Sequence, residues 1–187
     1  FRSSHHTPVF APAFLCVTLG VFYFGSAVWK ERVRGKREEH GVAAYELHRG
    51  EFTISTEKTR LQLDTIVAFL SRAYWAQGRT RDVIERSITR SLCFGLFAGN
   101  RQIGFARVVT DCATFAYLCD VFVDDQYRDQ GLGKWLMAGI MGHPDLQGLR
   151  RWLLATRDAH GLYKQFGWTE LKDPGRWMEI HNPPPVP

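Results

Sequence analysis

The sequence lacks several patterns that mark common classes of protein. None of its cysteines form a Cys-x-x-Cys pair, and all four lie in apolar surroundings (Cys16, Cys93, Cys112 and Cys119). This pattern is typical of free thiols in a reducing compartment and argues against a disulfide framework. The chain also has no internal repeat and no low-complexity tract. With 45% hydrophobic and 23% charged residues in 187 positions, we expect one ordinary folded domain with a core of its own.

The excess of positive charge is small, and part of it lies in the N-terminal segment. The formal net charge is +5; residues 1–50 carry seven Lys or Arg against four Asp or Glu, and residues 51–187 carry seventeen against fifteen. The main body is therefore close to neutral. It also lacks a dense basic stripe with interleaved aromatics, which is the pattern of a nucleic-acid-binding surface. We therefore expect no nucleic-acid partner.

A hydrophobic N-terminal segment sets the first fifty residues apart from the rest. Residues 9–29 contain no charged side chain, and five Lys or Arg follow between Lys30 and Arg37. Such a segment can span a bilayer, with the basic flank holding its C-terminal side in the cytoplasm. Two other interpretations are a signal peptide cleaved after Ala27 and a non-native read-through, since no Met precedes Met137. We expect residues 1–50 to be an extension, either a membrane anchor or foreign to the working protein, and the domain to occupy residues 51–182.

Short strands and helices alternate after Gly50. Apolar residues recur at helical spacing through residues 60–75, and Thr80 has the side chain of an N-cap for a second helix that runs to Ser91. Gly99-Asn100 between two apolar runs indicates a β-hairpin. Further helices are expected from Gly133 to a stop at Gly142 and over residues 159–166. Strands are expected over residues 51–55, 93–98, 103–110, 115–123, 151–156, 168–171 and 177–180. This order predicts an α+β fold, with helices packed on a largely antiparallel sheet.

A glycine-containing loop joins the strand over 115–123 to the helix that follows it. Backbone N–H groups at such a helix start lack partners and, with the helix dipole, form a cradle for an anionic phosphate. Two other phosphate motifs do not fit. The P-loop needs Ser or Thr where Trp135 stands, and the dinucleotide fingerprint needs a third glycine where Leu136 stands.

What does fit is the Arg-x-x-Gly-x-Gly spacing from Arg128 to Gly133, after a strand that ends in Asp120-Val121-Phe122-Val123. It resembles the acetyl-CoA signature of the GCN5-related N-acetyltransferase (GNAT) superfamily, Gln/Arg-x-x-Gly-x-Gly/Ala. About thirty residues on, Ala159 to Trp168 is similar to the family's segment A-x-x-x-Y-x-x-x-G-F/W. The resemblance covers residues 51–181. It implies the GNAT fold, a mixed and mostly antiparallel sheet of six to seven strands flanked by helices on both faces, and acetyl-CoA as co-substrate.

The resemblance also implies roles for individual residues. The backbone of the strand end (Val121, Phe122 and Val123) would hold the acetyl carbonyl and the pantetheine arm like an added strand, and a β-bulge here is a family feature. The pyrophosphate would be held by backbone amides of Asp129, Gln130, Gly131, Leu132, Gly133 and Lys134, with charge added by Arg128 and Lys134. Tyr163 would protonate the departing CoA thiolate. Asp158 would contact the pantetheine, although the family often has Asn at this position.

The amine that attacks must lose a proton, and Asp120 is the candidate base because it directly precedes the acetyl-binding segment. Strand alternation places it on the opposite face from Val121 unless a bulge intervenes. A carboxylate that only accepts backbone hydrogen bonds or binds a cationic substrate fits the pattern equally well. In this family the connection between the first two helices commonly contacts the substrate. Here Tyr74 and Trp75 would form an aromatic wall, and Arg79 or Arg81 would meet a carboxylate.

The expected function is acetyl transfer from acetyl-CoA to a primary amine by direct attack, with no covalent enzyme intermediate and no metal. The nearly neutral domain favours a small molecule as acceptor. Alternatives are a non-catalytic acyl-CoA-binding module and a protein N-acetyltransferase. The expected location is the cytoplasm, or a membrane tether through residues 9–29 with the domain on the cytoplasmic side. A homodimer is a further option.

Overall fold

The computed structural model describes residues 44–182. One six-stranded sheet runs through this part of the chain in the order β1-β2-β3-β4-β5-β6. Its strands are β1 (Glu46–Arg49), β2 (Phe52–Ser55), β3 (Leu92–Ala98), β4 (Arg101–Thr110), β5 (Phe115–Val123) and β6 (Arg151–Leu153). Neighbouring strands are antiparallel except β5 and β6, which are parallel. The predicted α+β fold with a mixed, mostly antiparallel sheet is thereby confirmed.

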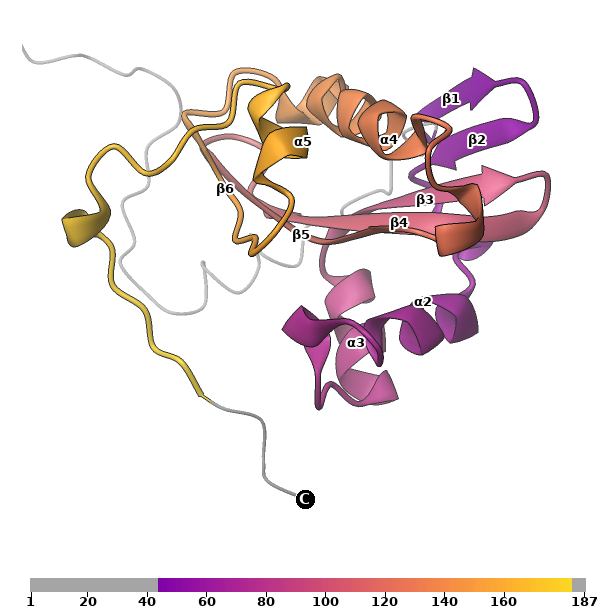
Figure 1. Ribbon diagram of the computed structural model, residues 1–187, viewed down its shortest axis with the longest axis horizontal. Helices are drawn as coiled ribbons and strands as arrows, with labels where there is room; N and C mark the ends of the chain where they lie inside the picture. The colour runs from indigo at the N-terminus through magenta and orange to yellow at the C-terminus, as the bar shows by residue number, and fades with distance from the viewer. Residues whose placement is uncertain (1–43, 183–187) are drawn as a thin grey trace, which may run out of the picture. The chain divides into compact units, whose positions relative to one another are not determined.

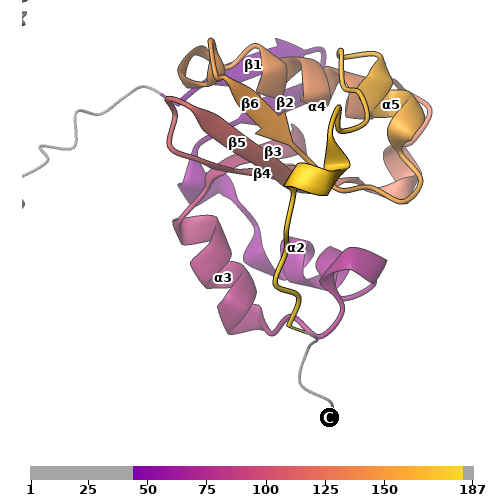
Figure 2. The same ribbon diagram turned by 90° about the vertical axis from the view of Figure 1, so that its left-hand side faces the viewer.

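Helices cover both faces of this sheet, as Figures 1 and 2 show. The helices are α2 (Leu63–Leu70) and α3 (Arg81–Thr89) on one face, and α4 (Leu132–Met141) and α5 (His160–Lys164) on the other. Each face has its own apolar core. Ile66 of α2 packs with Phe105 and Phe122 in one core, and Met137 of α4 packs with Phe94 in the other. The core residues of the sheet therefore alternate between two helical layers.

Local signals in the sequence account for several element ends. The Thr80 side chain accepts a hydrogen bond from the Val83 amide and caps α3, as predicted. Gly99 has a φ of +56° and, with Asn100, turns β3 into β4, which confirms the predicted hairpin. Helix α4 ends at Gly142, whose amide donates to the carbonyl of Ala138. These positions need only short-range chemistry, so a sequence pattern can reveal them.

The two strands predicted at the C-terminal end are wrong. Residues 168–171 and 177–180 are not in strands, and the 3₁₀ turn Pro174–Arg176 lies between them. Met178 and Ile180 are 97% and 92% exposed. Their aromatic and β-branched residues favour extended structure, but a strand also needs a hydrogen-bonded neighbour, and no described strand pairs with these segments.

Other predicted elements are shorter than expected. The helix expected over residues 60–75 is limited to α2, with 3₁₀ turns at Lys58–Arg60 and Tyr74–Ala76. The helix expected to reach Ser91 ends at Thr89, because Leu92 already belongs to β3 and pairs with Val108 of β4. Similarly, β6 covers only the first half of its predicted range and α5 only the centre of its own. The pattern of apolar residues continues past the residues that make the hydrogen bonds of a helix or a sheet. It therefore overestimates the lengths of these elements.

The first strand, β1, is an element that the sequence pattern does not predict. It pairs antiparallel with β2 across a tight turn at Gly50, whose φ is +61°. The sheet therefore begins at Glu46, before the expected domain start at residue 51. The predicted hydrophobic segment over residues 9–29 lies outside the described residues. Within residues 44–182, no helix has the length and hydropathy needed to cross a membrane.

Candidate active site

A β-bulge interrupts the pairing of β4 and β5 at Asp120. Phe105 pairs with Phe122 and Arg107 pairs with Cys119, so one residue of β4 faces two of β5. Asp120 has a φ of +56°, a left-handed conformation that is rare outside glycine and asparagine-like residues. After the bulge, Val121 packs with the α4 core and Phe122 with the α2 core.

At the bulge, the Asp120 side chain forms ion pairs with two arginines. Its Oδ1 accepts from Nη1 of Arg79 at 2.8 Å, and its Oδ2 accepts from Nε of Arg107 at 2.8 Å. The Asp120 side chain is only 1% exposed. Arg107 also donates from Nη1 to the hydroxyl of Ser91. One buried carboxylate thus holds two guanidinium groups.

The C-terminal half of β5 has one unpaired edge. Pairing with β6 covers only Phe115–Tyr117, and no other described strand lies along this edge. The amide of Asp124 donates to the carbonyl of Ile103 in β4. Because peptide groups alternate in direction along a strand, those of Val121 and Val123 point to the open edge. An extended ligand with amide groups can pair there like an added strand.

The loop after β5 ends in a nest of free amides at the start of α4. Gly131 has a φ of +70°, and the first hydrogen bond of the helix runs from the Trp135 amide to the Gly131 carbonyl at 3.0 Å. The amides of Leu132, Gly133 and Lys134 therefore have no acceptor within the helix. No side chain caps this terminus. Together with the helix dipole, the three amides suit a phosphate group.

An arginine side chain that the sequence analysis did not identify lies next to this nest. Arg49 of β1 donates from Nη2 to the Gln130 carbonyl at 2.7 Å, and its guanidinium lies over the Trp135 ring. Arg128, one of the two predicted cations, pairs with Asp125. No local signal identifies Arg49, because it lies 81 positions before Gln130, in a segment assigned to the extension.

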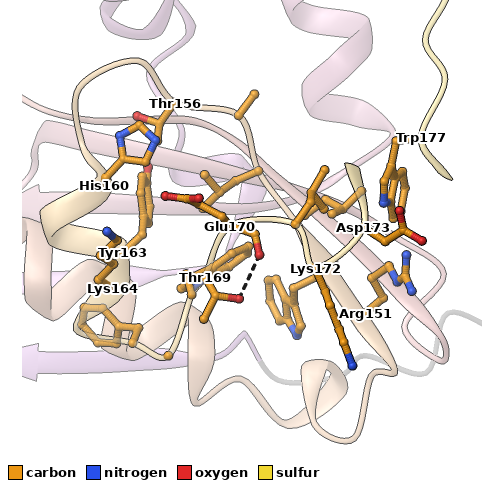
Figure 3. Close-up of a pocket in the computed structure, with 18 of the residues that line it drawn as sticks. Arg151, Thr156, His160, Tyr163, Lys164, Thr169, Glu170, Lys172, Asp173 and Trp177 are labelled. Carbon is orange, nitrogen blue, oxygen red and sulfur yellow. Dashed lines mark hydrogen bonds between the residues drawn. The ribbon is translucent and has the colours of Figure 1, made fainter. Parts of the chain in front are cut away.

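Tyr163 is a partly buried phenol on α5. Burial raises its pKa from 10 to about 12, and Tyr74 and Asp158 add to the rise. The hydroxyl is therefore protonated at neutral pH and can act as a proton donor. Figure 3 shows Tyr163 with His160 and Lys164 on one side of a cavity of about 1060 Å³, and Arg151 with Trp177 on the other. Trp168, whose ring meets that of Tyr163 edge-on, also lines this cavity.

The connection between α2 and α3 meets the connection between β6 and α5. The Tyr74 hydroxyl accepts a hydrogen bond from the Arg157 amide at 3.1 Å, and the Arg157 guanidinium lies 3.7 Å from the centre of the Tyr74 ring. Trp75 packs edge-on against Tyr74, and its carbonyl lies 3.4 Å from Nη2 of Arg79. These contacts bring the predicted wall of Tyr74 and Trp75 next to Arg79, the partner of Asp120, and next to Arg157, which precedes α5.

Two predicted site residues have other partners. Arg81 pairs with Asp64 of α2, and both side chains are largely exposed. Asp158 lies 3.6 Å from the guanidinium of Arg157.

Arg107 is a site residue that the sequence analysis missed, although the sequence contains a signal for it. It is a single charged residue inside an apolar run, and a charge in a buried strand needs a partner.

Comparisons with known proteins give matches to acetyltransferases. Residues 89–170 match the family model "Acetyltransferase (GNAT) domain". A candidate acetyltransferase from Gibberella zeae is 30% identical over 149 residues, which are 67% of this chain and 83% of that protein. The crystal structure of a candidate acetyltransferase of the GNAT family from Xanthomonas campestris is 45% identical, with a TM-score of 0.71 over 74% of this chain and 98% of the other.

A more distant neighbour shares the fold alone. A predicted acetyltransferase from Clostridium acetobutylicum, whose crystal structure includes acetyl-CoA, is 11% identical with a TM-score of 0.52. The match covers 70% of this chain and 94% of that chain.

Proposed function

The chain belongs to the GNAT family and is a GNAT-type N-acetyltransferase, and we propose that it moves the acetyl group of acetyl-CoA to the primary amine of a small molecule. The observation that carries this proposal is the open edge of β5 at Val121 and Val123, followed in the chain by the amide nest after Gly131. An extended pantetheine arm with amide groups fits the first feature, and a pyrophosphate fits the second. The acetyl-CoA named for one distant neighbour supports the same choice of co-substrate.

In the proposed reaction the neutral amine attacks the thioester carbonyl directly. A carbon–nitrogen bond forms, the carbon–sulfur bond breaks, and sulfur leaves with the electron pair. Tyr163 donates its hydroxyl proton to that sulfur. Burial raises its pKa to about 12, so the hydroxyl carries its proton at neutral pH and has it to donate as negative charge develops on the sulfur.

A second group must accept the proton that the attacking amine loses. Asp120 is our candidate from the sequence, and it lies directly before the acetyl-binding segment. Both of its oxygens already accept from guanidinium groups. Proton uptake at Asp120 would therefore weaken an ion pair with Arg79 or Arg107. This arrangement favours another role for Asp120, which is to hold Arg79 in place, and the amine proton is then passed to water.

Thermal unfolding of the full chain tests the proposal. A ligand that binds the folded state raises the melting temperature by mass action. We expect acetyl-CoA and CoA to stabilise the protein and ATP and NAD to have no effect. A screen of small amines, with free thiol as the readout, should then detect turnover. A folded sample that does not respond to acetyl-CoA would overturn the proposal, whereas binding without thiol release would favour an acyl-CoA-binding module.

A further inference from the structure

We propose that the acceptor amine also carries a carboxylate and that Arg79 binds it. This inference rests on the proposed function and names the substrate class of the same site. Of the two arginines that the sequence offers for a carboxylate, Arg81 is engaged with Asp64 of α2. Arg79 instead reaches Asp120 at the bulge, one residue before the strand edge assigned to the acetyl group. Arg79 is therefore the one that lies where the reacting amine must come.

Arg79 retains hydrogen-bond donors that the described residues do not use. A guanidinium has five N–H groups in a planar fork. In Arg79, Nη1 donates to Asp120, and Nη2 makes only a long contact of 3.4 Å with the Trp75 carbonyl. Within residues 44–182, its Nε donates no hydrogen bond. The side chain is 33% exposed, so a ligand can reach it.

The charges around Arg79 favour an anion. Asp120 is shared between Arg79 and Arg107, so the cluster has two positive charges and one negative charge. Arg157 lies over the ring of Tyr74, the residue next to Trp75, with the exposed Asp158 as a loose partner at 3.6 Å. These five charged groups sum to one excess positive charge. A ligand carboxylate would balance this charge at a partly buried position, where the attraction between opposite charges is stronger than in bulk water.

The carboxylate also fixes the orientation of the substrate, because a planar guanidinium can bind both carboxylate oxygens at once. Asp120 acts here as a positioning residue, since it holds the guanidinium without touching the substrate.

The aromatic pair next to Arg79 suits the rest of such an acceptor. Tyr74 and Trp75 are partly exposed and pack edge-on, with ring centres 5.0 Å apart. They form an apolar surface next to the guanidinium, since the Trp75 carbonyl itself approaches Nη2 of Arg79. An α-amino acid with an apolar or aromatic side chain combines an amine, a carboxylate and a group for this surface.

The test compares acceptors that differ only in the carboxylate. Tyrosine and tyramine form one pair, and phenylalanine and phenethylamine form a second. Phosphoethanolamine and ethanolamine test a phosphate instead. Thiol release by the full chain gives kcat/KM for each compound. We expect the carboxylated member of each pair to be preferred by about 10- to 100-fold, the range of a charge-assisted hydrogen bond converted to an affinity ratio.

Variants of the protein then locate the binding group. Arg79→Gln should remove the preference mainly through KM, while stabilisation by acetyl-CoA persists. Arg79→Lys keeps a positive charge next to Asp120 and should retain part of the preference. Arg86→Gln serves as the matched control, since Arg86 is an exposed α3 residue paired with Asp82.

Four outcomes overturn the inference. Equal turnover of both members of each amino-acid pair would do so while leaving acetyl transfer intact. A preference for phosphoethanolamine would replace the carboxylate by a phosphate. Loss of the preference in Arg81→Gln, and not in Arg79→Gln, would assign it to the other arginine. Absence of any stabilisation by acetyl-CoA would remove the proposed function and this inference together.

Discussion

Asp120 and Arg79 are 41 positions apart in the sequence, and their side chains meet at 2.8 Å at the bulge of β5. This ion pair connects the strand that offers an open edge to the loop that carries Tyr74 and Trp75. Arg107 holds the second oxygen of the same carboxylate at an equal distance. The three residues therefore tie the substrate side of the site to the sheet, and their geometry leads to the first prediction.

Replacing Asp120 with Asn should lower the free energy of unfolding by about 3–5 kcal/mol, because it removes the partner of a buried guanidinium. Urea unfolding monitored by tryptophan fluorescence measures the change. The control is Asp64→Asn, which breaks an exposed pair with Arg81 and should cost less than about 1 kcal/mol. Equal losses in the two variants would contradict the buried pair.

Replacing Tyr163 with Phe should lower kcat by about 100-fold or more, the effect of losing a positioned general acid. Binding of acetyl-CoA should change little, since only the hydroxyl is removed. Thiol release and thermal stabilisation measure the two quantities. Tyr45→Phe is the control, because that ring packs on His143, and its activity should equal that of the wild type. An unchanged kcat in Tyr163→Phe would remove Tyr163 as the acid.

The two glycines at the start of α4, Gly131 and Gly133, should respond differently to alanine. Gly131 is left-handed at φ +70°, so Gly131→Ala should cost about 1–2 kcal/mol and reduce stabilisation by acetyl-CoA. Gly133 lies within α4, and a Cβ there meets no atom within 4 Å. Gly133→Ala should therefore raise stability by up to about 1 kcal/mol and retain binding. Thermal unfolding with and without acetyl-CoA measures both, and a harmless Gly131→Ala would argue against the nest.

The three described cysteines should differ in reactivity. Burial raises the pKa of Cys93 to about 12 and that of Cys119 to about 11, so little thiolate forms at either residue near neutral pH. Cys112 is exposed. Iodoacetamide at pH 8, followed by peptide mapping, should modify Cys112 well before the other two. The denatured protein is the control, in which all three should react alike. Rapid labelling of Cys93 in the folded protein would contradict its burial.

Asp111 should make stability depend on acidic pH. Hydrogen bonds from the Thr114 hydroxyl and from the amides of Thr114, Ala113 and Phe115 hold its pKa below the ordinary 3.8. A carboxyl with a lowered folded-state pKa stabilises the fold above its unfolded pKa, and this contribution is lost as the pH falls below it. Asp111→Asn should therefore be less stable than the wild type at pH 7, with a smaller difference at pH 3. Urea unfolding at both values tests this, and a constant difference would exclude the linkage.

Features that depend on neighbours in the sequence were predicted well. The ends of β5, the hairpin at Gly99, the cap at Thr80 and the stop at Gly142 all follow from local residue chemistry. The loop before α4 belongs to the same class, because a left-handed turn at Gly131 and free helical amides require only the residues around them. The family motifs that cover Arg128–Gly133 and Ala159–Trp168 made the activity predictable for the same reason.

The strand–loop–helix unit and the family can therefore be predicted from local residue patterns. Contacts between distant residues place β1 in the sheet, leave residues 168–171 and 177–180 without a strand, and bring Arg49 to the amide nest. The fold also pairs Arg79 with Asp120 and leaves Arg81 paired with Asp64. Strand pairing and buried ion pairs join residues far apart in the chain. The free energy of each such contact depends on which residues the fold brings together. No local pattern contains that information.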